Sequence, residues 1–260
     1  MKKIRRVALR SSSPDSCAET IIEAGLQLVD NPAEADAVVV AGGDGTILRY
    51  MNELLPVKRP VLAVNAGHLG FLADCELESM ADALGIIREG LYSISELPVI
   101  EADCGGSTAR ALNDICINRC PEGGILHITV SVDGGQVASI ASDGVLVSTP
   151  SGSTAYNLSC GGPILHPNLP AVIINAICPH LLAIRPIVVP LSSVVKFTVT
   201  RAREKAPLIL ADGVSRCGSL EAGDSITVRD SGLRCPVIRT GESGDHYTVL
   251  GCKLGWGFRG

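Results

Sequence analysis

Residues 37–55 read AVVVAGGDGTILRYMNELL, and this stretch decides the fold of the first part of the chain. The small and β-branched residues at 37–41 are typical of a buried strand in a parallel sheet. From Ile47 onward, apolar residues recur at the spacing of one helix face, and Pro56 predicts where that helix stops. Between strand and helix lies GGDGT, at 42–46. We therefore expect a strand–turn–helix unit with a glycine-rich turn.

The glycines of this turn, Gly42, Gly43 and Gly45, let the backbone approach an anion, and the N–H groups of the following helix point at it. With Thr46 they are candidate phosphate-binding residues. Asp44 is the one carboxylate of the turn, and a bound polyphosphate would repel it unless a metal ion or a hydroxyl proton engages it. Asp44 is therefore a candidate general base or metal-linked group. An ordinary helix N-cap is the alternative interpretation of the same residue.

A second candidate region is DGVLVSTPSGSTAYNLSCGGP, at 143–163. A strand-like apolar segment at 145–147 leads into Ser, Thr, Gly and Pro, and then into Ala155 and Tyr156. Backbone N–H groups, short hydroxyls and one aromatic face within a few residues suit a polar, planar, phosphate-bearing ligand such as a nucleotide. By composition alone a Gly/Ser-rich connector fits this run better, and the turn at 42–46 is what favours the nucleotide.

The ordered motifs of this chain resemble those of the NAD kinases. They are GGDGT, the segment NAGHLGFL at 65–72, Leu112-Asn113-Asp114, the run at 143–163, and RPIVVP at 185–190. GGDGT alone also occurs in diacylglycerol kinases, sphingosine kinases and related phosphofructokinases, so STPSGSTAY is the more specific motif. The resemblance implies an α/β N-terminal domain with a parallel sheet plus a β-rich C-terminal domain, the NAD kinase/diacylglycerol kinase-like fold. It also implies phosphorylation of the 2′-hydroxyl of the adenosine ribose of NAD, with ATP or another phosphoryl donor.

The resemblance further implies roles for single residues. Asp44, with Gly45 beside it, is expected at the adenosine ribose, where Asp44 draws the proton from the attacking 2′-hydroxyl. Asn113 is expected at the adenine and Asp114 at the ribose hydroxyls. The family commonly has Glu where this chain has Asp114, which leaves the reach of the shorter side chain in question. The other NAD contacts implied are Asp143, Ser151, Thr154, Ala155, Tyr156 and Ser159.

The residues by themselves leave alternatives for these positions. An Asn-Asp turn before a strand is a common structural feature, so only the resemblance favours a binding role for Asn113. Tyr156 has the alternative of a core aromatic, which its small and polar neighbours disfavour. Asp143 has the alternative of a plain turn residue.

Composition narrows the functional classes. Of the 260 residues, 46% are hydrophobic but only 3% aromatic, so aliphatic side chains must build the cores. The net charge of −5, with no basic block beyond residues 2–6, argues against nucleic acid as a partner. No apolar run approaches a membrane span, and the basic start lacks the apolar segment of a signal peptide, so we expect a cytoplasmic protein that binds no membrane.

The ten cysteines form no Cys-x-x-Cys pair, and we expect them to be reduced and mostly structural. The five histidines lack metal-ligand spacing, so no metal-ligating residue is predicted. The divalent metal expected, Mg²⁺, would arrive with ATP.

Strand and helix signals alternate up to about residue 97 and indicate a parallel sheet covered on both faces. Beyond it the chain is β-rich, and Asp133-Gly134-Gly135 predicts a tight hairpin. We expect an α/β domain at 1–97 carrying the phosphate turn and a β-rich NAD-binding domain at 98–240. A tail at 241–260, with a short strand at 247–249, is expected from the resemblance to return to the first domain. The helix that opens the chain is expected over 14–28.

Two other functions fit parts of the sequence. A lipid kinase would share GGDGT but would need a membrane-facing apolar or basic surface. A non-catalytic NAD(P)-binding protein would keep the run at 143–163 and tolerate loss of Asp44, which is present. Neither a Walker A motif nor a Gly-x-Gly-x-x-Gly fingerprint occurs, which disfavours a P-loop enzyme and a Rossmann dehydrogenase. The resemblance, and β-strand edges that need cover, also predict a homodimer or homotetramer.

Overall fold

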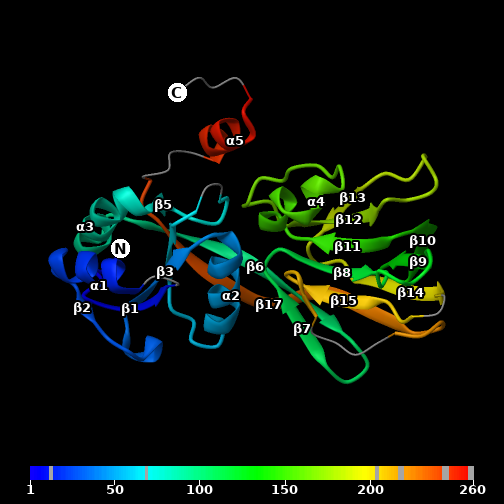
Figure 1. Cartoon of the computed structure of the whole chain (residues 1–260), viewed down its shortest axis with the longest axis horizontal. Coiled ribbons are helices and arrows are strands. Elements are labelled where there is room, and N and C mark those ends of the chain that lie inside the picture. The colour runs from blue at the N-terminus through cyan, green and yellow to red at the C-terminus, as the bar shows by residue number, and fades with distance from the viewer. Residues whose placement is uncertain (12–13, 68–69, 203–204, 216–219, 242–245, 257–260) are drawn as a thin grey trace. The chain divides into compact units, whose positions relative to one another are not determined.

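The structure is a computed structural model that describes residues 1–260 except 12–13, 68–69, 203–204, 216–219, 242–245 and 257–260. The chain divides into two compact units: Met1–Leu97 with Arg234–Gly260, and Pro98–Leu233 (Figure 1). Strands β6 (Ser93–Asp103) and β17 (Ser225–Arg239) each contribute residues to both units. The division into a phosphate-binding domain at 1–97, an NAD-binding domain at 98–240 and a tail at 241–260 stays a prediction.

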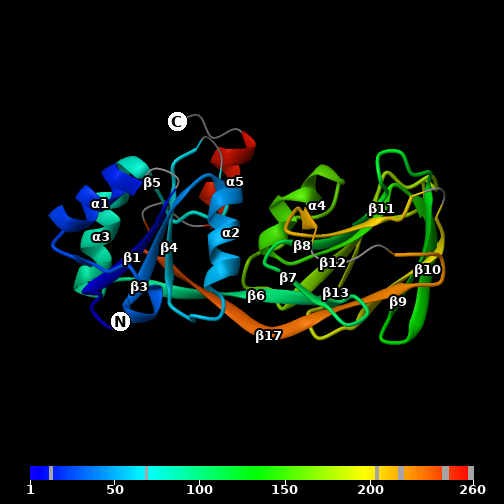
Figure 2. The ribbon, with the colours of Figure 1, turned by 60° about the horizontal axis from the view of Figure 1, so that its bottom comes forward.

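The first unit is built on a parallel sheet. Its strands lie in the order β2 (Gln27–Leu28), β1 (Arg6–Ser11), β3 (Ala37–Gly42), β4 (Val61–Asn65), with β5 (Cys75–Glu76) and the end of β17 both paired to β4. Helices α1 (Pro14–Glu23) and α3 (Met80–Glu89) cover one face, and α2 (Asp44–Leu54) covers the other (Figure 2). Short 3-10 turns are η1 (Pro32–Glu34) and η2 (Leu77–Ser79).

Strand β3 is buried on both faces, as its apolar run predicts. Val39 packs into the core that α1 and α3 share with the sheet, whereas Val38 and Val40 point to the face that α2 covers. All three side chains are fully buried. A strand buried on both faces has no need of polar alternation, and this is why the run is continuous. Because β3 ends at Gly42, helix α2 begins two residues later, at Asp44.

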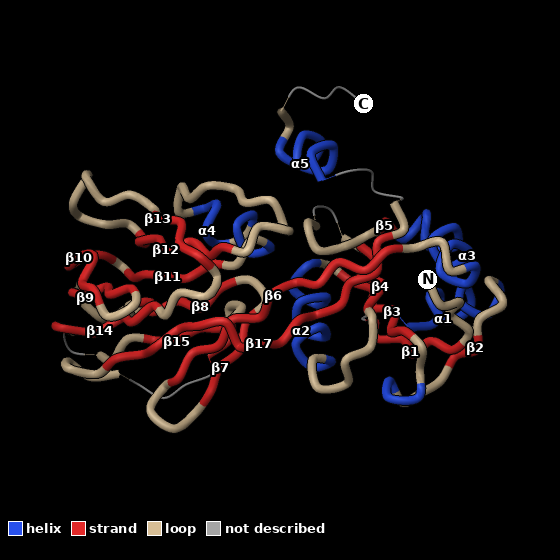
Figure 3. The backbone as a smooth tube through the Cα atoms, turned by 180° about the vertical axis from the view of Figure 1, so that it is seen from behind, coloured by secondary structure: helices blue, strands red, loops and turns tan. Residues whose placement is uncertain are grey.

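The second unit consists of two antiparallel layers (Figure 3). One contains β10 (Gly135–Ser142), β9 (Leu126–Val132), β14 (Val195–Arg201) and β17, with β6 paired to β17 and to β7 (Thr108–Ala111). The other runs β13 (Ile187–Pro190), β12 (Ala171–Ile177), β11 (Gly144–Ser148), β8 (Asp114–Asn118), β15 (Leu208–Ala211), β16 (Val214–Ser215). The short helices η3 (Ser151–Thr154) and α4 (Tyr156–Ser159) follow β11.

The period of two along β8 sorts its residues between two environments. Ile115 and Ile117 point into the aliphatic core of the second unit. Cys116 therefore lies on the outer face, where Cys160, the residue after α4, packs against its cluster. Asp114 shares that outer face by the same alternation. A carboxylate is thus placed beside the run at 143–163.

The structure corrects two expectations about the elements and adds a strand that the sequence did not predict. The tail forms a helix, α5 (His246–Leu254), where a strand was predicted at 247–249, because burial of Leu250 and Gly251 outweighs the β-propensity of Tyr-Thr-Val. The first helix stops at Glu23 rather than near residue 28, since Gly25 adopts φ 75° and the chain enters β2. Strand β12 was not predicted at all.

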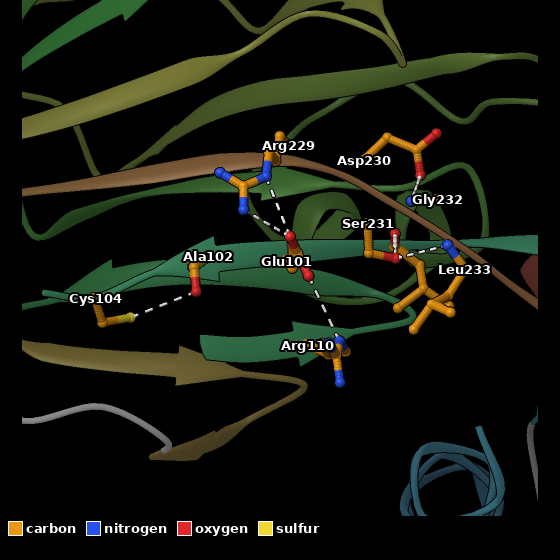
Figure 4. Close-up of polar contacts among 10 residues, drawn as sticks. Glu101, Ala102, Cys104, Arg110, Arg229, Asp230, Ser231, Gly232 and Leu233 are labelled. Atoms are coloured by element: carbon orange, nitrogen blue, oxygen red, sulfur yellow. Dashed lines mark hydrogen bonds and ion pairs between the residues drawn. The ribbon is translucent and has the colours of Figure 1, made fainter. Parts of the chain in front are cut away.

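Polar contacts around Glu101 join three strands of the second unit (Figure 4). The Glu101 carboxylate of β6 accepts from Arg229 of β17 at 2.8 Å and lies 3.5 Å from Nε of Arg110 on β7. Nearby, the Ser231 hydroxyl donates to the Val99 carbonyl at 2.7 Å. These contacts hold β17 and β7 against β6.

The cysteines of the described residues are free thiols, with Cys104 as the exception. Cys104 is disulfide-bonded, so the expectation of reduced cysteines is wrong for this residue. The free thiols are Cys17, Cys75, Cys116, Cys120, Cys160, Cys178, Cys235 and Cys252.

Candidate active site

The glycine-rich turn lies between β3 and α2 in the first unit. Gly43 is the N-cap of α2, and its carbonyl accepts from the N–H groups of Thr46 and Ile47 at 2.9 and 3.0 Å. A Cβ at Gly42 would lie 2.7 Å from the Thr46 side chain, which therefore packs on the bare glycine. A Cβ at Gly43 or Gly45 would meet no atom within 4 Å. The turn thus presents open backbone at a helix N-terminus, a suitable place for phosphate.

Asp44 is the first residue of α2, and its side chain is held at only one oxygen. The backbone N–H of Phe71 donates to Oδ2 at 2.9 Å. Oδ1 is buried and has no hydrogen-bond partner among the described residues. Because Gly43 is the N-cap and no side chain caps α2, the interpretation of Asp44 as an ordinary N-cap is wrong.

Burial raises the pKa of Asp44 above its usual range, against the opposing effect of the Phe71 and Leu72 N–H groups and of Lys253. A carboxylate with a raised pKa and an unused buried oxygen can accept a proton from a bound hydroxyl.

The loop after β4 shapes the surroundings of this carboxylate. The Asn65 amide donates to Glu76 at 2.6 Å and accepts from the Gly67 N–H at 3.0 Å, while the Ala66 N–H donates to the Gly42 carbonyl at 3.1 Å. A Cβ at Gly70 would lie 2.5 Å from Oδ1 of Asp44, so the carboxylate occupies space that only glycine leaves. His68 and Leu69, in the same predicted motif, lie outside the described residues.

Two residues from the end of the chain bear on the same loop. Lys253, on α5, places its ammonium group 5.7 Å from the centroid of the Phe71 ring. Asp74 accepts from the backbone N–H of Thr240 at 2.9 Å and from its hydroxyl at 2.5 Å. Sequence reasoning missed Lys253, because the tail was expected to form a strand and carried no motif of its own.

In the second unit, the motif at 112–114 packs directly against the run at 143–163. The Ser151 hydroxyl donates to the Asn113 side-chain oxygen at 3.0 Å. A Cβ at Gly152 would lie 2.1 Å from the Asn113 carbonyl oxygen, so no other residue fits there. Two regions predicted separately from the sequence therefore form one surface.

Asp114 is buried, and burial together with the nearby Asp212 raises its pKa to about 7. Within the described residues, no hydrogen bond joins its carboxylate to another side chain. Both oxygens are thus available to accept from the hydroxyls of a bound ribose.

The remaining residues of the run divide into two groups. Ser153 and Asn157 are fully buried and structural: Ser153 bonds to Pro150 at 2.6 Å, and Asn157 donates to the carbonyls of Ser153 and Pro163 at 3.1 and 3.0 Å. Tyr156, in contrast, is 36% exposed, so the alternative of a core aromatic is wrong. The predicted contact residues of the run at 151–159 are all partly or fully accessible: Ser151, Thr154, Ala155, Tyr156 and Ser159.

Asp143 forms an ion pair that the sequence did not predict. Nε of Arg119 donates to its carboxylate at 2.7 Å, and the two side chains are 37% and 35% exposed. Arg119 follows β8 directly and Asp143 precedes β11, which pairs with β8. The pair therefore fixes the Asp143 carboxylate at the end of this ladder and leaves it reachable from solvent.

The described residues around the glycine turn offer a divalent cation one carboxylate oxygen and no complete set of protein ligands. No group of three or more His, Cys, Asp or Glu side chains in the described part of the chain could hold a metal ion. Mg²⁺ usually binds through one or two carboxylates plus substrate phosphates and water, and Oδ1 of Asp44 beside the open turn supplies one such oxygen. Among the described helices, none has the length and hydropathy needed to cross a membrane.

An open glycine-rich turn at a helix N-terminus, a buried carboxylate inside it, a parallel α/β unit and a β-rich unit are the features expected of a nucleotide-dependent phosphotransferase of the α/β-plus-β type. Family models match most of the chain: the ATP-NAD kinase N-terminal domain at residues 8–92 and the ATP-NAD kinase C-terminal domain at residues 112–240. The chain belongs to the NAD kinase family.

Relatives named NAD kinase align with most or nearly all of this chain. The NAD kinase of Syntrophotalea carbinolica is 36% identical over 88% of this chain and 81% of its own, and that of Magnetococcus marinus is 34% identical over 98% and 85%. Among solved structures, an NAD kinase from Archaeoglobus fulgidus in complex with ATP has a TM-score of 0.77 at 26% identity, over 94% of this chain and 98% of its own. Yeast NADH kinase complexed with NADH has a TM-score of 0.85 at 22% identity, over 100% and 90%, and shares the fold.

Proposed function

We propose that this chain transfers the γ-phosphoryl group of ATP to the 2′-hydroxyl of the adenosine ribose of NAD and so makes NADP. Family membership supports this activity. The observation in the structure that carries the proposal is the Asp44 carboxylate, which is buried, has no partner at Oδ1 among the described residues, and lies in an open glycine turn. Phosphoryl transfer needs alignment, charge neutralisation and one group that orients the nucleophile, and this turn can serve these needs.

In the proposed reaction, Oδ1 of Asp44 accepts the proton of the 2′-hydroxyl. The ribose oxygen forms a bond to the γ-phosphorus while the bond from that phosphorus to the β-phosphate bridging oxygen breaks, and ADP leaves. The backbone at Gly42, Gly43 and Gly45, with Thr46, binds phosphate oxygens. Mg²⁺ would arrive with ATP and would neutralise phosphate charge when bound.

The second unit is proposed to hold NAD. Asn113 pairs with the adenine, Asp114 accepts from ribose hydroxyls, and Ser151 and Thr154 bond the adenine. The Ala155 backbone and the Asp143 carboxylate serve the nicotinamide side. Tyr156 lends a ring face, and Ser159 and Gly45 complete the NAD contacts. The exposure of Tyr156 and the unpaired oxygens of Asp114 support these roles.

The test is to incubate purified protein with NAD, ATP and Mg²⁺ and to assay NADP enzymatically. Parallel reactions replace ATP by polyphosphate, omit Mg²⁺ with EDTA, or replace NAD by diacylglycerol in vesicles. NADP formed only with NAD and a phosphoryl donor supports the proposal. Phosphorylated lipid would favour a lipid kinase, and NAD binding without turnover would favour a non-catalytic binding protein.

We also propose a homodimer or homotetramer that works in the cytoplasm, where ATP and NAD are available. Edge strand β13 exposes Ile187 and Val188, which are 39% and 48% accessible, and a second copy could cover them. Light scattering at micromolar concentration tests the assembly: a monomer would remove it. Cell fractionation tests the location.

A further inference from the structure

One carboxylate outside the motifs holds the backbone of the motif at 112–114. Asp212 lies in the hairpin between β15 and β16. Its Oδ1 accepts from the N–H groups of Asn113 at 2.8 Å and Asp114 at 3.2 Å, and its Oδ2 accepts from the N–H of Leu112 at 2.8 Å. Three successive backbone donors thus converge on one side chain from about a hundred residues along the chain.

The contact is reciprocal and continues a β-ladder. The backbone N–H of Asp212 donates to the Asp114 carbonyl at 2.9 Å, directly beyond the pairing of Ala211 with Ile115. Leu112 and Asn113 lie between β7 and β8, and their N–H groups donate to the Asp212 carboxylate instead of to a neighbouring strand. Hydrogen bonds to a charged acceptor are stronger than those to a neutral one. Asp212 therefore fixes the backbone from which the side chains of Asn113 and Asp114 project.

A second hairpin of the same unit offers a natural comparison. Asp133 and Asp212 have nearly the same backbone angle, φ 50° and φ 51°, and each precedes a glycine of positive φ. Asp133 accepts one backbone N–H, that of Val194, at 2.8 Å. Asp133 and Asp212 therefore occupy the same kind of turn. They differ in the backbone that each carboxylate binds, which for Asp212 is the motif at 112–114.

We propose that Asp212 is a positioning residue for NAD, which sets the Asn113 amide and the Asp114 carboxylate in the geometry that recognises the adenosine half. The proposal rests on the proposed function of that pair. Asp212 itself touches no substrate, and its effect is on affinity for the dinucleotide rather than on the transfer step. Small displacements of positioned groups reduce binding steeply, and about tenfold is a reasonable expectation for a loosened pair.

The same arrangement gives a second readout. Asp114 faces Asp212 from the hairpin, the Cys116 thiol from β8 and the Cys160 thiol after α4. Asp212 is the charged neighbour that raises the pKa of Asp114, so removing its charge lowers that pKa. The pH at which NAD affinity changes should then move downward.

The experiment compares Asp212→Asn with the matched control Asp133→Asn, since asparagine tolerates the left-handed backbone at both sites. Steady-state kinetics give kcat and KM for NAD and for ATP between pH 5.5 and 9, and thermal unfolding gives Tm. In Asp212→Asn we expect KM for NAD to rise about tenfold, kcat and KM for ATP to stay within about twofold, and the pH midpoint of KM for NAD to fall. The control should show the parental KM for NAD and a smaller loss of Tm, because Asp133 accepts one backbone N–H where Asp212 accepts three.

A parental KM for NAD in Asp212→Asn overturns the proposal, as does an equal rise in both KM values that tracks the loss of Tm. If Asp212→Asn does not fold, Asp212→Glu keeps the charge on a longer side chain and should raise KM for NAD in the same direction. A parent enzyme that makes no NADP overturns the proposed function instead, so the two failures are distinguishable.

Discussion

Asp44 shows how one residue gains reactivity from its surroundings rather than from its type. A surface aspartate is charged and solvated near neutral pH, and it is a weak base. Here burial raises the pKa of Asp44, and the Phe71 N–H donates to Oδ2 while Oδ1 is left without a described partner. The unpaired oxygen has a cost in the free protein that a hydroxyl or a metal ion can relieve on binding.

Replacing Asp44 by Asn should lower kcat by about 10²- to 10⁴-fold, because the amide cannot accept the hydroxyl proton. The Kd for NAD, measured by calorimetry, should change little, since the lost interaction acts mainly in the transition state. The control is Asp82→Asn, an exposed acid in the first turn of α3. Turnover near that of the parent would remove Asp44 from the catalytic role.

Asp114 should make stability depend on pH. Its pKa of about 7 lies above the ordinary value of 3.8, so between these values the folded state keeps a proton that the unfolded chain releases. Stability from this group therefore falls as pH rises through that window and levels off above about pH 7. Asp114→Asn removes the buried charge, and its Tm relative to the parent should be higher at pH 8 than at pH 5. An identical Tm difference at both pH values would contradict this assignment.

At the scale of elements, two segments far from GGDGT in the sequence shape the environment of Asp44. The loop between β4 and β5 donates the Phe71 N–H and leaves the space at Gly70. Helix α5 places Lys253 near the Phe71 ring, where its charge lowers the pKa of Asp44. The loop fixes the position of the Asp44 carboxylate, and the charge of Lys253 on α5 lowers the pKa of that carboxylate.

Gly70→Ala tests the loop. The new Cβ would lie 2.5 Å from Oδ1 of Asp44, and the carboxylate must turn away. We expect kcat to fall at least tenfold while Tm drops by only a few degrees, because a side chain rather than backbone yields. As a control, Gly85→Ala in α3 meets no atom within 4 Å and should stabilise the protein by about 0.5–1 kcal/mol. Parental kcat in Gly70→Ala would show that the position of Oδ1 does not matter.

Lys253→Met tests the helix. Methionine keeps the apolar stem and removes the charge that lowers the pKa of Asp44, so that pKa should rise further. The acid limb of the pH profile of kcat/KM for NAD should then move to higher pH, because the base must be deprotonated to act. Lys253→Arg should retain the parental limb, and Lys196→Met, at an exposed site on β14, should not move it. An unmoved limb in Lys253→Met would mean that its charge does not reach Asp44.

At the scale of the whole molecule, the proposed phosphate-binding turn belongs to the first unit and the proposed NAD-binding residues mostly to the second. The second unit is the single segment Pro98–Leu233, inserted between the two segments of the first unit, and strands β6 and β17 supply residues to both units. NAD binding should therefore be visible in the stability of the entire chain.

NAD at a hundred times its Kd should add about 2.7 kcal/mol to the free energy of unfolding and raise Tm by several degrees.

Tyr156→Ala should lose about 1–3 kcal/mol of NAD affinity, whereas Tyr156→Phe keeps the ring and should bind nearly as well as the parent. Asp143→Asn should likewise weaken NAD more than ATP. Equal weakening of NAD and ATP with a lower Tm in all variants would show that these residues are scaffold.

Local patterns were enough to predict most of the elements and the candidate motifs, with α5, β12 and the end of α1 as exceptions. The continuous apolar run of β3, the glycines after it and the Asp-Gly turn at Asp133 each express a constraint carried by neighbouring residues, so the sequence alone predicts them. The family motifs likewise indicated Asn113, Asp114 and the run at 143–163, and the structure packs these together.

Only the tertiary structure decided which groups surround the motifs. Asp212 is 99 residues from Asn113 and Phe71 is 27 residues from Asp44, so no local pattern links them. The pairing of Arg119 with Asp143, 24 residues apart, follows from the β8–β11 ladder. The tail became helix α5 because burial outweighed the β-propensity of three residues. Hydrogen bonding, burial and charge act through space, and the fold alone brings such residues together.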